Sequence, residues 1–180
     1  EYVTLDTGVD KSKNIFHSIH LSNWQRDQWV SKGGDFNKSS VLPIPGIEQL
    51  SNINLREELG IKKSDIVLGF HQRQDDNIYS PIPLNVFKNL NDKNTHFILM
   101  GGSELYKNFA KKKNLDNIHF LKHDSNPLRI SSFLNTLDIY CHGRSDGETF
   151  GTVLAEAMLH KLPCVSHVST IANGHIETIG

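Results

Sequence analysis

Two glutamates stand eight residues apart in the last third of the chain, and both have surroundings that suit a ligand. Glu148 lies in a glycine-flanked stretch at 147–151, and Glu156 lies in an apolar stretch that predicts a helix. A loop that opens into a helix presents free backbone N–H groups and a positive dipole end, which bind phosphate. A carboxylate accepts charge-assisted hydrogen bonds from sugar hydroxyls. Phosphate and sugar at one place indicate a nucleotide-sugar.

Each glutamate also has a plainer interpretation. Glu148 suits a turn at a helix N-terminus, where the dipole favours a negative charge. A helical glutamate such as Glu156 is commonly a surface residue. The predicted helix is so apolar, however, that we expect it to be covered nearly all round, with Met158 in its core arc. A buried carboxylate without partners is costly, and ribose hydroxyls are suitable partners.

The elements that must position these residues alternate between strand and helix from residue 64 onward. Short apolar runs predict strands at 65–70, 96–100, 117–121, 138–141 and 163–166, with helices at 84–90, 103–114, 127–136 and 151–160. This alternation predicts an α/β fold with a doubly wound, Rossmann-like parallel sheet. Ligands of such sheets bind at the carboxyl ends of the strands.

Polar residues follow the predicted strands at that edge. Arg73 and Arg144 suit a diphosphate, although each is also explained as a solvated surface residue. His142 suits a hydrogen bond to a ligand or a satisfied loop histidine. Lys122 follows the third strand. The convergence of these groups on one edge is a stronger signal than any single residue.

The first part of the chain has a different pattern. Residues 14–21 predict one more strand, and residues 22–25 have the form of a capping box that opens a helix to about Lys32. Residues 41–46 are rich in proline, as a connector between domains would be, and a short helix at 55–59 leads into the sheet.

We therefore expect two parts. Residues 1–45 are predicted to be the tail of a preceding domain with its connector, and residues 46–180 a nucleotide-sugar-binding domain that lacks its C-terminal end. Neither end of the sequence has the pattern of a natural terminus, so we expect the chain to be a piece of a longer protein.

Composition argues against several classes of protein. The 19 basic and 20 acidic residues leave a formal net charge of −1, which gives no support to a nucleic-acid-binding protein. The sequence contains no apolar run long enough to span a membrane and no signal peptide. Two cysteines in apolar runs fit a reducing, cytoplasmic compartment. The histidine pairs at 17 and 20 and at 119 and 123 lack the clustered Cys or acidic partners of a metal site.

The stretch from Asp138 to Ser166 resembles the nucleotide-sugar-binding signature of retaining glycosyltransferases with the GT-B fold. This large family, group 1 or family 4-like, includes sucrose synthases and many bacterial mannosyl- and glucosyltransferases. Its motif is a glutamate, seven residues and a second glutamate, which stands here as Glu148 and Glu156, with Phe-Gly at 150–151. The resemblance extends to Glu177, covers most of the chain and implies the C-terminal half of a GT-B fold.

The resemblance also implies a role for each site residue. Glu148 would hold the hydroxyls of the donor sugar, and Arg73 the phosphate, as the two catalytic residues, while Glu156 would bind the ribose. The other positions that it assigns to the base and the diphosphate are Leu121, Lys122, Phe150, Gly151 and Thr152.

The implied reaction transfers a sugar from a nucleotide-diphospho-sugar to an unknown glycan, lipid or protein acceptor. Configuration is retained, and no metal or other cofactor is required. Peripheral membrane association of the whole protein stays open. The chain departs from the family pattern at two positions. The family places a lysine about five residues after the arginine, where this chain has Ile78, and Lys161 stands at a helix end where glycine is common. Two alternatives remain, namely a non-catalytic nucleotide-sugar-binding module and a GT-B-fold epimerase or phosphorylase. The isolated piece is expected to bind donor weakly and to turn over little.

Overall fold

The computed structural model describes residues 2–3, 7–46, 48, 50–90 and 92–180, and the chain forms two compact units. Unit 1 consists of Glu1–Pro45, Asp146–Thr152 and Val168–Gly180, and unit 2 consists of Gly46–Ser145 and Val153–His167. The two glutamates of the motif therefore belong to different units, Glu148 to unit 1 and Glu156 to unit 2.

Unit 2 is built on a five-stranded parallel sheet in the order β6-β5-β4-β7-β9. Its strands are β4 (Ile66–Gln72), β5 (Thr95–Gly101), β6 (Ile118–Leu121), β7 (Ile139–Cys141) and β9 (Cys164–Val165). The first strand lies in the middle and later strands are added outward on both sides, which is the order of a doubly wound sheet. The predicted fold class is confirmed, and each of these strands lies where its apolar run predicts one.

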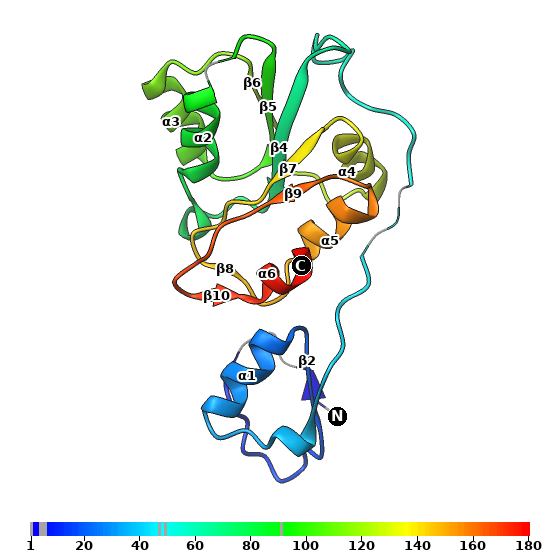
Figure 1. The fold of residues 1–180 in the computed structure, drawn as a ribbon, viewed down its shortest axis with the longest axis vertical. Helices are drawn as coiled ribbons and strands as arrows, with labels where there is room; N and C mark the ends of the chain where they lie inside the picture. The colour runs from blue at the N-terminus through cyan, green and yellow to red at the C-terminus, as the bar shows by residue number, and fades with distance from the viewer. Residues whose placement is uncertain (1, 4–6, 47, 49, 91) are drawn as a thin grey trace. The chain divides into compact units, whose positions relative to one another are not determined.

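Helices cover both faces of this sheet. They are α2 (Ile82–Leu90), α3 (Glu104–Lys113), α4 (Pro127–Leu134) and α5 (Thr152–Leu159), whose first residue belongs to unit 1. In Figure 1, α2 and α3 lie on one side of the sheet and α4 and α5 on the other. Ser103 caps α3 by accepting a hydrogen bond from the Leu105 backbone N–H.

The turn after β5 requires glycine. Gly101 and Gly102 have φ angles of +80° and +75°, and a Cβ atom on Gly101 would lie 2.1 Å from the carbonyl oxygen of Gln72. Only glycine adopts this backbone without strain while another strand passes so close. The glycine pair is thus explained by a strand-to-helix turn.

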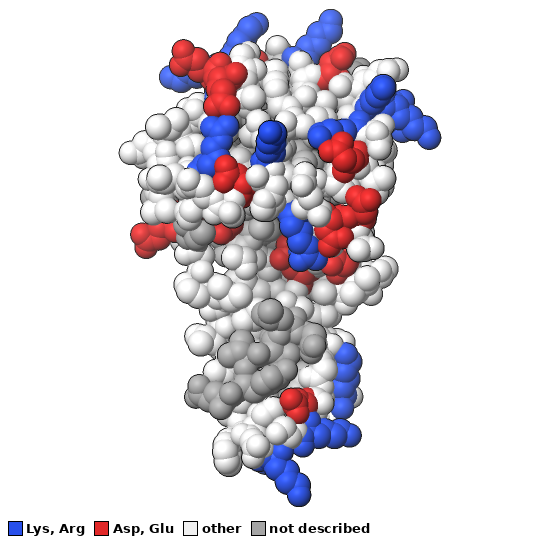
Figure 2. All heavy atoms as spheres, turned by 180° about the vertical axis from the view of Figure 1, so that it is seen from behind, with Lys and Arg blue, Asp and Glu red and all other residues white. Residues whose placement is uncertain are grey.

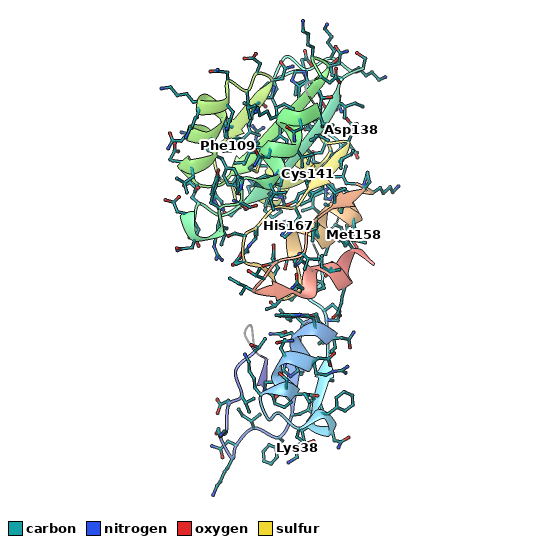
Figure 3. All side chains as sticks on the ribbon, turned by 60° about the vertical axis from the view of Figure 1, so that its left-hand side comes forward. Lys38, Phe109, Asp138, Cys141, Met158 and His167 are labelled. Atoms are coloured by element: carbon teal, nitrogen blue, oxygen red, sulfur yellow. The ribbon has the colours of Figure 1, made fainter. Side chains whose placement is uncertain are left out.

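Two expectations for unit 2 are wrong. Residues 55–59 form a single hydrogen-bonded turn, not a helix, because Gly60 at φ +67° ends the segment after one turn. The helix α5 is not covered all round: Met158, labelled in Figure 3, and Leu159 are each 45% exposed, while Leu154, Glu156 and Ala157 are buried.

Unit 1 contains two small parallel sheets and two helices. The first sheet has the order β1-β2-β3, and β8 pairs with β10 in the second. The elements are β1 (Tyr2–Val3), β2 (Ser18–His20), α1 (Asn23–Ser31), the short 3-10 helix Phe36–Lys38, β3 (Ser39–Val41), β8 (Gly147–Glu148), β10 (Ala172–Asn173) and α6 (Gly174–Ile179). The strand predicted at 14–21 is shorter than expected.

The serine half of the predicted capping box at the start of α1 is confirmed, while the glutamine side chain bonds to the residue before the cap. Ser22 Oγ accepts a hydrogen bond from the Gln25 backbone N–H at 3.1 Å, and Gln25 Oε1 accepts one from the Leu21 backbone N–H at 2.7 Å.

Across the described part of the chain, no helix combines the length and hydropathy that crossing a bilayer requires. Figure 2 shows basic and acidic side chains interspersed over the upper part of the visible face.

Candidate functional site

The carboxyl ends of the unit 2 strands form the edge at which the predicted binding residues meet. In the strand register, His71 of β4 lies beside Met100 of β5, and Met100 lies beside Leu121 of β6. Arg73 and Lys122 follow directly, and His142 comes after β7. The structure thus places the polar residues predicted to follow β4, β6 and β7 at one edge of the sheet.

Glu156 is buried at this sheet and has a protein partner. Its Oε2 atom lies 3.1 Å from Nε2 of His71, and the two side chains are only 8% and 10% exposed. The sequence pointed to ribose hydroxyls as suitable partners; the histidine is a partner that it did not identify. Oε1 of Glu156 has no hydrogen bond within the residues that the structure describes. One carboxylate oxygen is therefore held by the protein, and the other has no protein partner.

His71 is itself held on its other side. Its Nδ1 atom lies 3.3 Å from the hydroxyl of Tyr140, which is fully buried on β7. The ring of Phe133 on α4 meets the imidazole edge-on, with the centroids 5.7 Å apart. These contacts fix the plane of the imidazole and, through it, the position of Oε2 of Glu156.

The partnership between His71 and Glu156 was missed, although part of its signal is in the sequence. Alternation along β4 places Val67, Gly69 and His71 on one face of the sheet, the face that α4 and α5 cover. A histidine and a glutamate that face the same helix–sheet interface are suitable partners for each other. The pairing itself joins residues 85 positions apart, which no local pattern reveals.

Arg73 has an acidic partner of its own. Its Nε donates to Oδ2 of Asp75 at 3.2 Å, and the arginine side chain is 60% exposed. A hydrogen bond from the Asn77 backbone N–H and the charge of Arg73 lower the pKa of Asp75. Ile78, which stands where the family places a lysine, is buried, and its carbonyl accepts a hydrogen bond from the Ser145 backbone N–H.

The remaining unit 2 residues have different environments. His142 is buried, and its Nδ1 atom lies 2.8 Å from the Ser166 hydroxyl. Arg144 lies near the phenol of Tyr106. Burial raises the pKa of this phenol, and the positive charge of Arg144 lowers it. Lys122 is exposed. The cysteine on β7, labelled in Figure 3, is a free thiol whose pKa burial raises to about 12. Its environment gives it no nucleophilic character.

Glu148 lies in unit 1, where backbone contacts shape its surroundings. Its backbone N–H donates to Nδ1 of His175 at 3.2 Å. The preceding Gly147 has a φ of +64°, and a Cβ atom there would lie 1.8 Å from the carbonyl oxygen of Ala172. The turn before Glu148 therefore requires glycine. Gly151, at φ +92°, completes the loop before α5.

The loop 148–151 is tied to both helices of unit 1. The Thr149 carbonyl accepts a hydrogen bond from Ser22 Oγ at 2.5 Å, and the Phe150 carbonyl accepts one from the Thr178 hydroxyl. The carboxylate of Glu177 accepts hydrogen bonds from the first backbone N–H groups of α1, with 2.9 Å to that of Asn23. Sequence reasoning did not identify Ser22 and Thr178 as supports of this loop, or Glu177 as an acceptor for the first N–H groups of α1.

The predicted site residues thus fall into two groups. Unit 1 contains Glu148, Phe150, Gly151 and Thr152, and unit 2 contains Arg73, Leu121, Lys122, His142, Arg144 and Glu156. Within the described residues, no group of three or more His, Cys, Asp and Glu side chains is arranged to hold a metal ion. His20 packs beside Trp29 with ring centroids 4.9 Å apart, and Nε2 of His119 lies 3.1 Å from Nδ1 of His96.

Solved structures with the same architecture include glycosyltransferases. Anabaena HepE, solved with UDP and glucose, is 20% identical and superposes with a TM-score of 0.68 over 90% of this chain and 46% of its own. A glycosyltransferase from Rickettsia africae is 16% identical, with a TM-score of 0.73 over 98% of this chain and 53% of its own. The lipopolysaccharide outer core galactosyltransferase WaaB is 15% identical, with a TM-score of 0.65 over 92% of this chain and 46% of its own.

These likenesses establish the fold, and the chain spans about half the length of these three structures. No curated protein sequence matches it significantly. The family model described as glycosyl transferases group 1 matches residues 51–177, which is well over half of the chain. The chain therefore belongs to the family of group 1 glycosyl transferases.

Proposed function

We propose that this chain is the donor-binding part of a glycosyltransferase that moves a sugar from a nucleotide-diphospho-sugar to an acceptor and retains the anomeric configuration. The observation that carries the proposal is Glu156. It is a carboxylate buried at a doubly wound parallel sheet, with one oxygen held by His71 and the other without a protein partner. Membership of the family supports the proposal, as does the UDP bound in HepE structures.

The roles of the residues follow from their chemistry and from the family motif. Glu156 would accept hydrogen bonds from ribose hydroxyls. Glu148 would hold hydroxyls of the donor sugar, and backbone N–H groups of Phe150, Gly151 and Thr152 would meet the diphosphate. The end of β6, at Leu121 and Lys122, would hold the base.

The proposed catalysis is electrostatic. Negative charge develops on the leaving diphosphate, and fixed positive groups stabilise that charge. Arg73 is suited to this because its bond to Asp75 is solvent-exposed, so exchanging the carboxylate for a phosphate costs little. Arg144 and Lys122 are the other cations proposed for the site, and His142 is proposed as a hydrogen-bond donor.

A second candidate function is a non-catalytic nucleotide-sugar-binding module. Ile78 supports it, because this buried apolar residue occupies the position where the family has a cationic lysine. Hydrolysis of UDP-glucose by the full-length protein separates the two candidates. Detection by NMR of glucose released first as the α anomer supports a retaining enzyme. Binding without release supports the module, and release of the β anomer first contradicts retention.

Calorimetric titration of UDP, GDP and ADP into the chain tests donor binding directly. We expect one nucleotide to bind and Glu156→Ala to weaken that binding about tenfold or more. Glu57→Ala, which removes an exposed glutamate of the same unit, is the matched control and should leave the affinity unchanged. Equal affinity in wild type and Glu156→Ala would remove Glu156 from the site.

Adding EDTA to the same titration tests the prediction that no metal is required. Four further points stay predictions from the sequence: the cytoplasmic location, the division into a tail at 1–45 and a domain at 46–180, the glycan, lipid or protein nature of the acceptor, and peripheral membrane association.

A further inference from the structure

His71 is not among the residues proposed to contact the donor, yet it contacts the carboxylate of Glu156. It lies between Tyr140 and Glu156, with hydrogen-bonding distances of 3.3 Å from Nδ1 to the tyrosine hydroxyl and 3.1 Å from Nε2 to Oε2 of Glu156. All three side chains are buried. These three side chains therefore form a hydrogen-bonded group in the interior of the unit, not a contact on its surface.

Chemistry fixes the direction of the hydrogen bond between His71 and Glu156. An ionised carboxylate only accepts, so Nε2 of His71 carries a hydrogen and donates it to Oε2. If the imidazole is neutral, Nδ1 is an acceptor and faces the hydroxyl of Tyr140, which can donate to Nδ1 at 3.3 Å or to the His71 carbonyl oxygen at 3.2 Å. If the imidazole is protonated, Nδ1 donates to the same hydroxyl oxygen. In both states Tyr140 supports a ring orientation that leaves Nε2 directed at Glu156.

We infer that His71 is a positioning residue for ribose recognition: it holds Oε2 of Glu156 so that Oε1 is presented to a ribose hydroxyl. The inference rests on the proposed donor-binding function. A carboxylate on a flexible glutamate side chain can rotate, and each rotation moves the acceptor away from the ligand. Anchoring one oxygen removes that freedom before the ligand arrives, which lowers the entropic cost of binding.

Two amide substitutions separate positioning from a general effect on packing. In His71→Gln the amide nitrogen is as many bonds from Cα as Nε2 is, so it can still reach Glu156. In His71→Asn the amide nitrogen corresponds to Nδ1, so it can reach Tyr140 but not Glu156. Both variants introduce an amide at the same buried position and differ mainly in reach, which makes them a matched pair.

The measurement is the affinity of each protein for UDP and for 2′,3′-dideoxy-UDP, by calorimetry. Wild type should prefer UDP by about tenfold or more, because the dideoxy ligand leaves Oε1 unpaired. We expect His71→Gln to keep most of this preference and His71→Asn to reduce it to about two- to threefold. Affinity for the dideoxy ligand should be similar in all three proteins, since that ligand makes no use of Oε1.

The outcomes are distinct. An equal loss of affinity for both ligands in His71→Asn, or an unchanged preference in that variant, overturns the inference. If thermal unfolding shows that His71→Asn does not fold, Tyr140→Phe gives the second test. We expect this variant to lose a smaller part of the preference for UDP, and an unchanged preference would contradict the inference. If wild type binds none of UDP, GDP and ADP, the proposed function itself fails. If Glu156→Ala weakens binding and His71→Asn does not, only the role of His71 fails.

Discussion

The two glutamates of the motif are held in place by different means. In unit 2, Glu156 is fixed through side chains: a histidine at 3.1 Å, and a tyrosine behind that histidine, on neighbouring strands of one sheet. In unit 1, the surroundings of Glu148 are shaped through the backbone, by a glycine turn and by hydrogen bonds from α1 and α6 to the loop carbonyls. Changes of side-chain chemistry should therefore damage unit 2 most, and changes of backbone or capping should damage unit 1.

The largest effect is expected from breaking the buried pair in unit 2. His71→Leu leaves the carboxylate of Glu156 buried without its partner, which should lower the free energy of unfolding by about 3 kcal/mol. Replacing both residues, in His71→Leu with Glu156→Leu, should restore most of that loss because no buried carboxylate is left without its partner. Urea unfolding of the two variants and wild type measures the difference. Additive losses in the double variant would show that the pair is not coupled.

In unit 1, a methyl group on a glycine should have the next largest effect. Gly147→Ala places a Cβ atom against the Ala172 carbonyl at a positive φ and should cost about 2 kcal/mol or more. The control is Gly33→Ala, where φ is +100° but a Cβ atom would have no neighbour within 4 Å, and about 1 kcal/mol is expected. Equal losses of unfolding free energy in the two variants would contradict the close contact between β8 and β10.

Removing the cap of α1 should have a smaller effect. Ser22→Ala removes both the hydrogen bond from the Gln25 backbone N–H and the bond to the Thr149 carbonyl, at a cost of about 1 kcal/mol. Ser31→Ala, which alters a hydroxyl at the other end of the same helix, should change stability by less than about 0.5 kcal/mol. Circular dichroism during thermal unfolding follows both variants. Equal effects would show that the position of the serine in α1 is irrelevant.

The smallest effect is expected on the pH dependence of the unfolding free energy. His20 is fully buried in unit 1, and neither of its ring nitrogens has a hydrogen-bond partner in the described structure. Burial, with the charges of Arg26 and His17, lowers its pKa. The unfolded chain therefore binds a proton more readily than the folded one, so stability should fall as the pH drops below about 6.5. The slope from one group is at most about 1.4 kcal/mol per pH unit.

A second contribution to this pH dependence comes from unit 2, where burial and the neighbouring His96 also lower the pKa of His119. Thermal unfolding between pH 5 and 7.5 should show a weaker pH dependence in both His20→Leu and His119→Leu. Removing both histidines should flatten the profile further. A profile in His20→Leu that matches wild type would contradict the assignment of part of this dependence to unit 1.

The sequence predicted what local pattern determines. The apolar runs located every strand of the main sheet, and the serine at residue 22 marked the start of α1. It did not predict β8, β10 or α6, because two-residue strands and a six-residue helix leave no periodic signal and depend on tertiary contacts. The partner of Glu156 was missed for a similar reason, since side chains 85 residues apart meet only in the folded sheet.

The hydrogen bond from the Asn23 backbone to Glu177 joins residues 154 positions apart, and it has a consequence for biosynthesis. The start of α1 is translated before the sheet of unit 2, but it receives this carboxylate only after Glu177 has left the ribosome. All of unit 2 has by then been made, because its last residue is His167. The sheet of unit 2 can therefore form while the chain is still growing, whereas unit 1 is completed after its synthesis. Until then, the first backbone N–H groups of α1 lack the Glu177 carboxylate that accepts their hydrogen bonds.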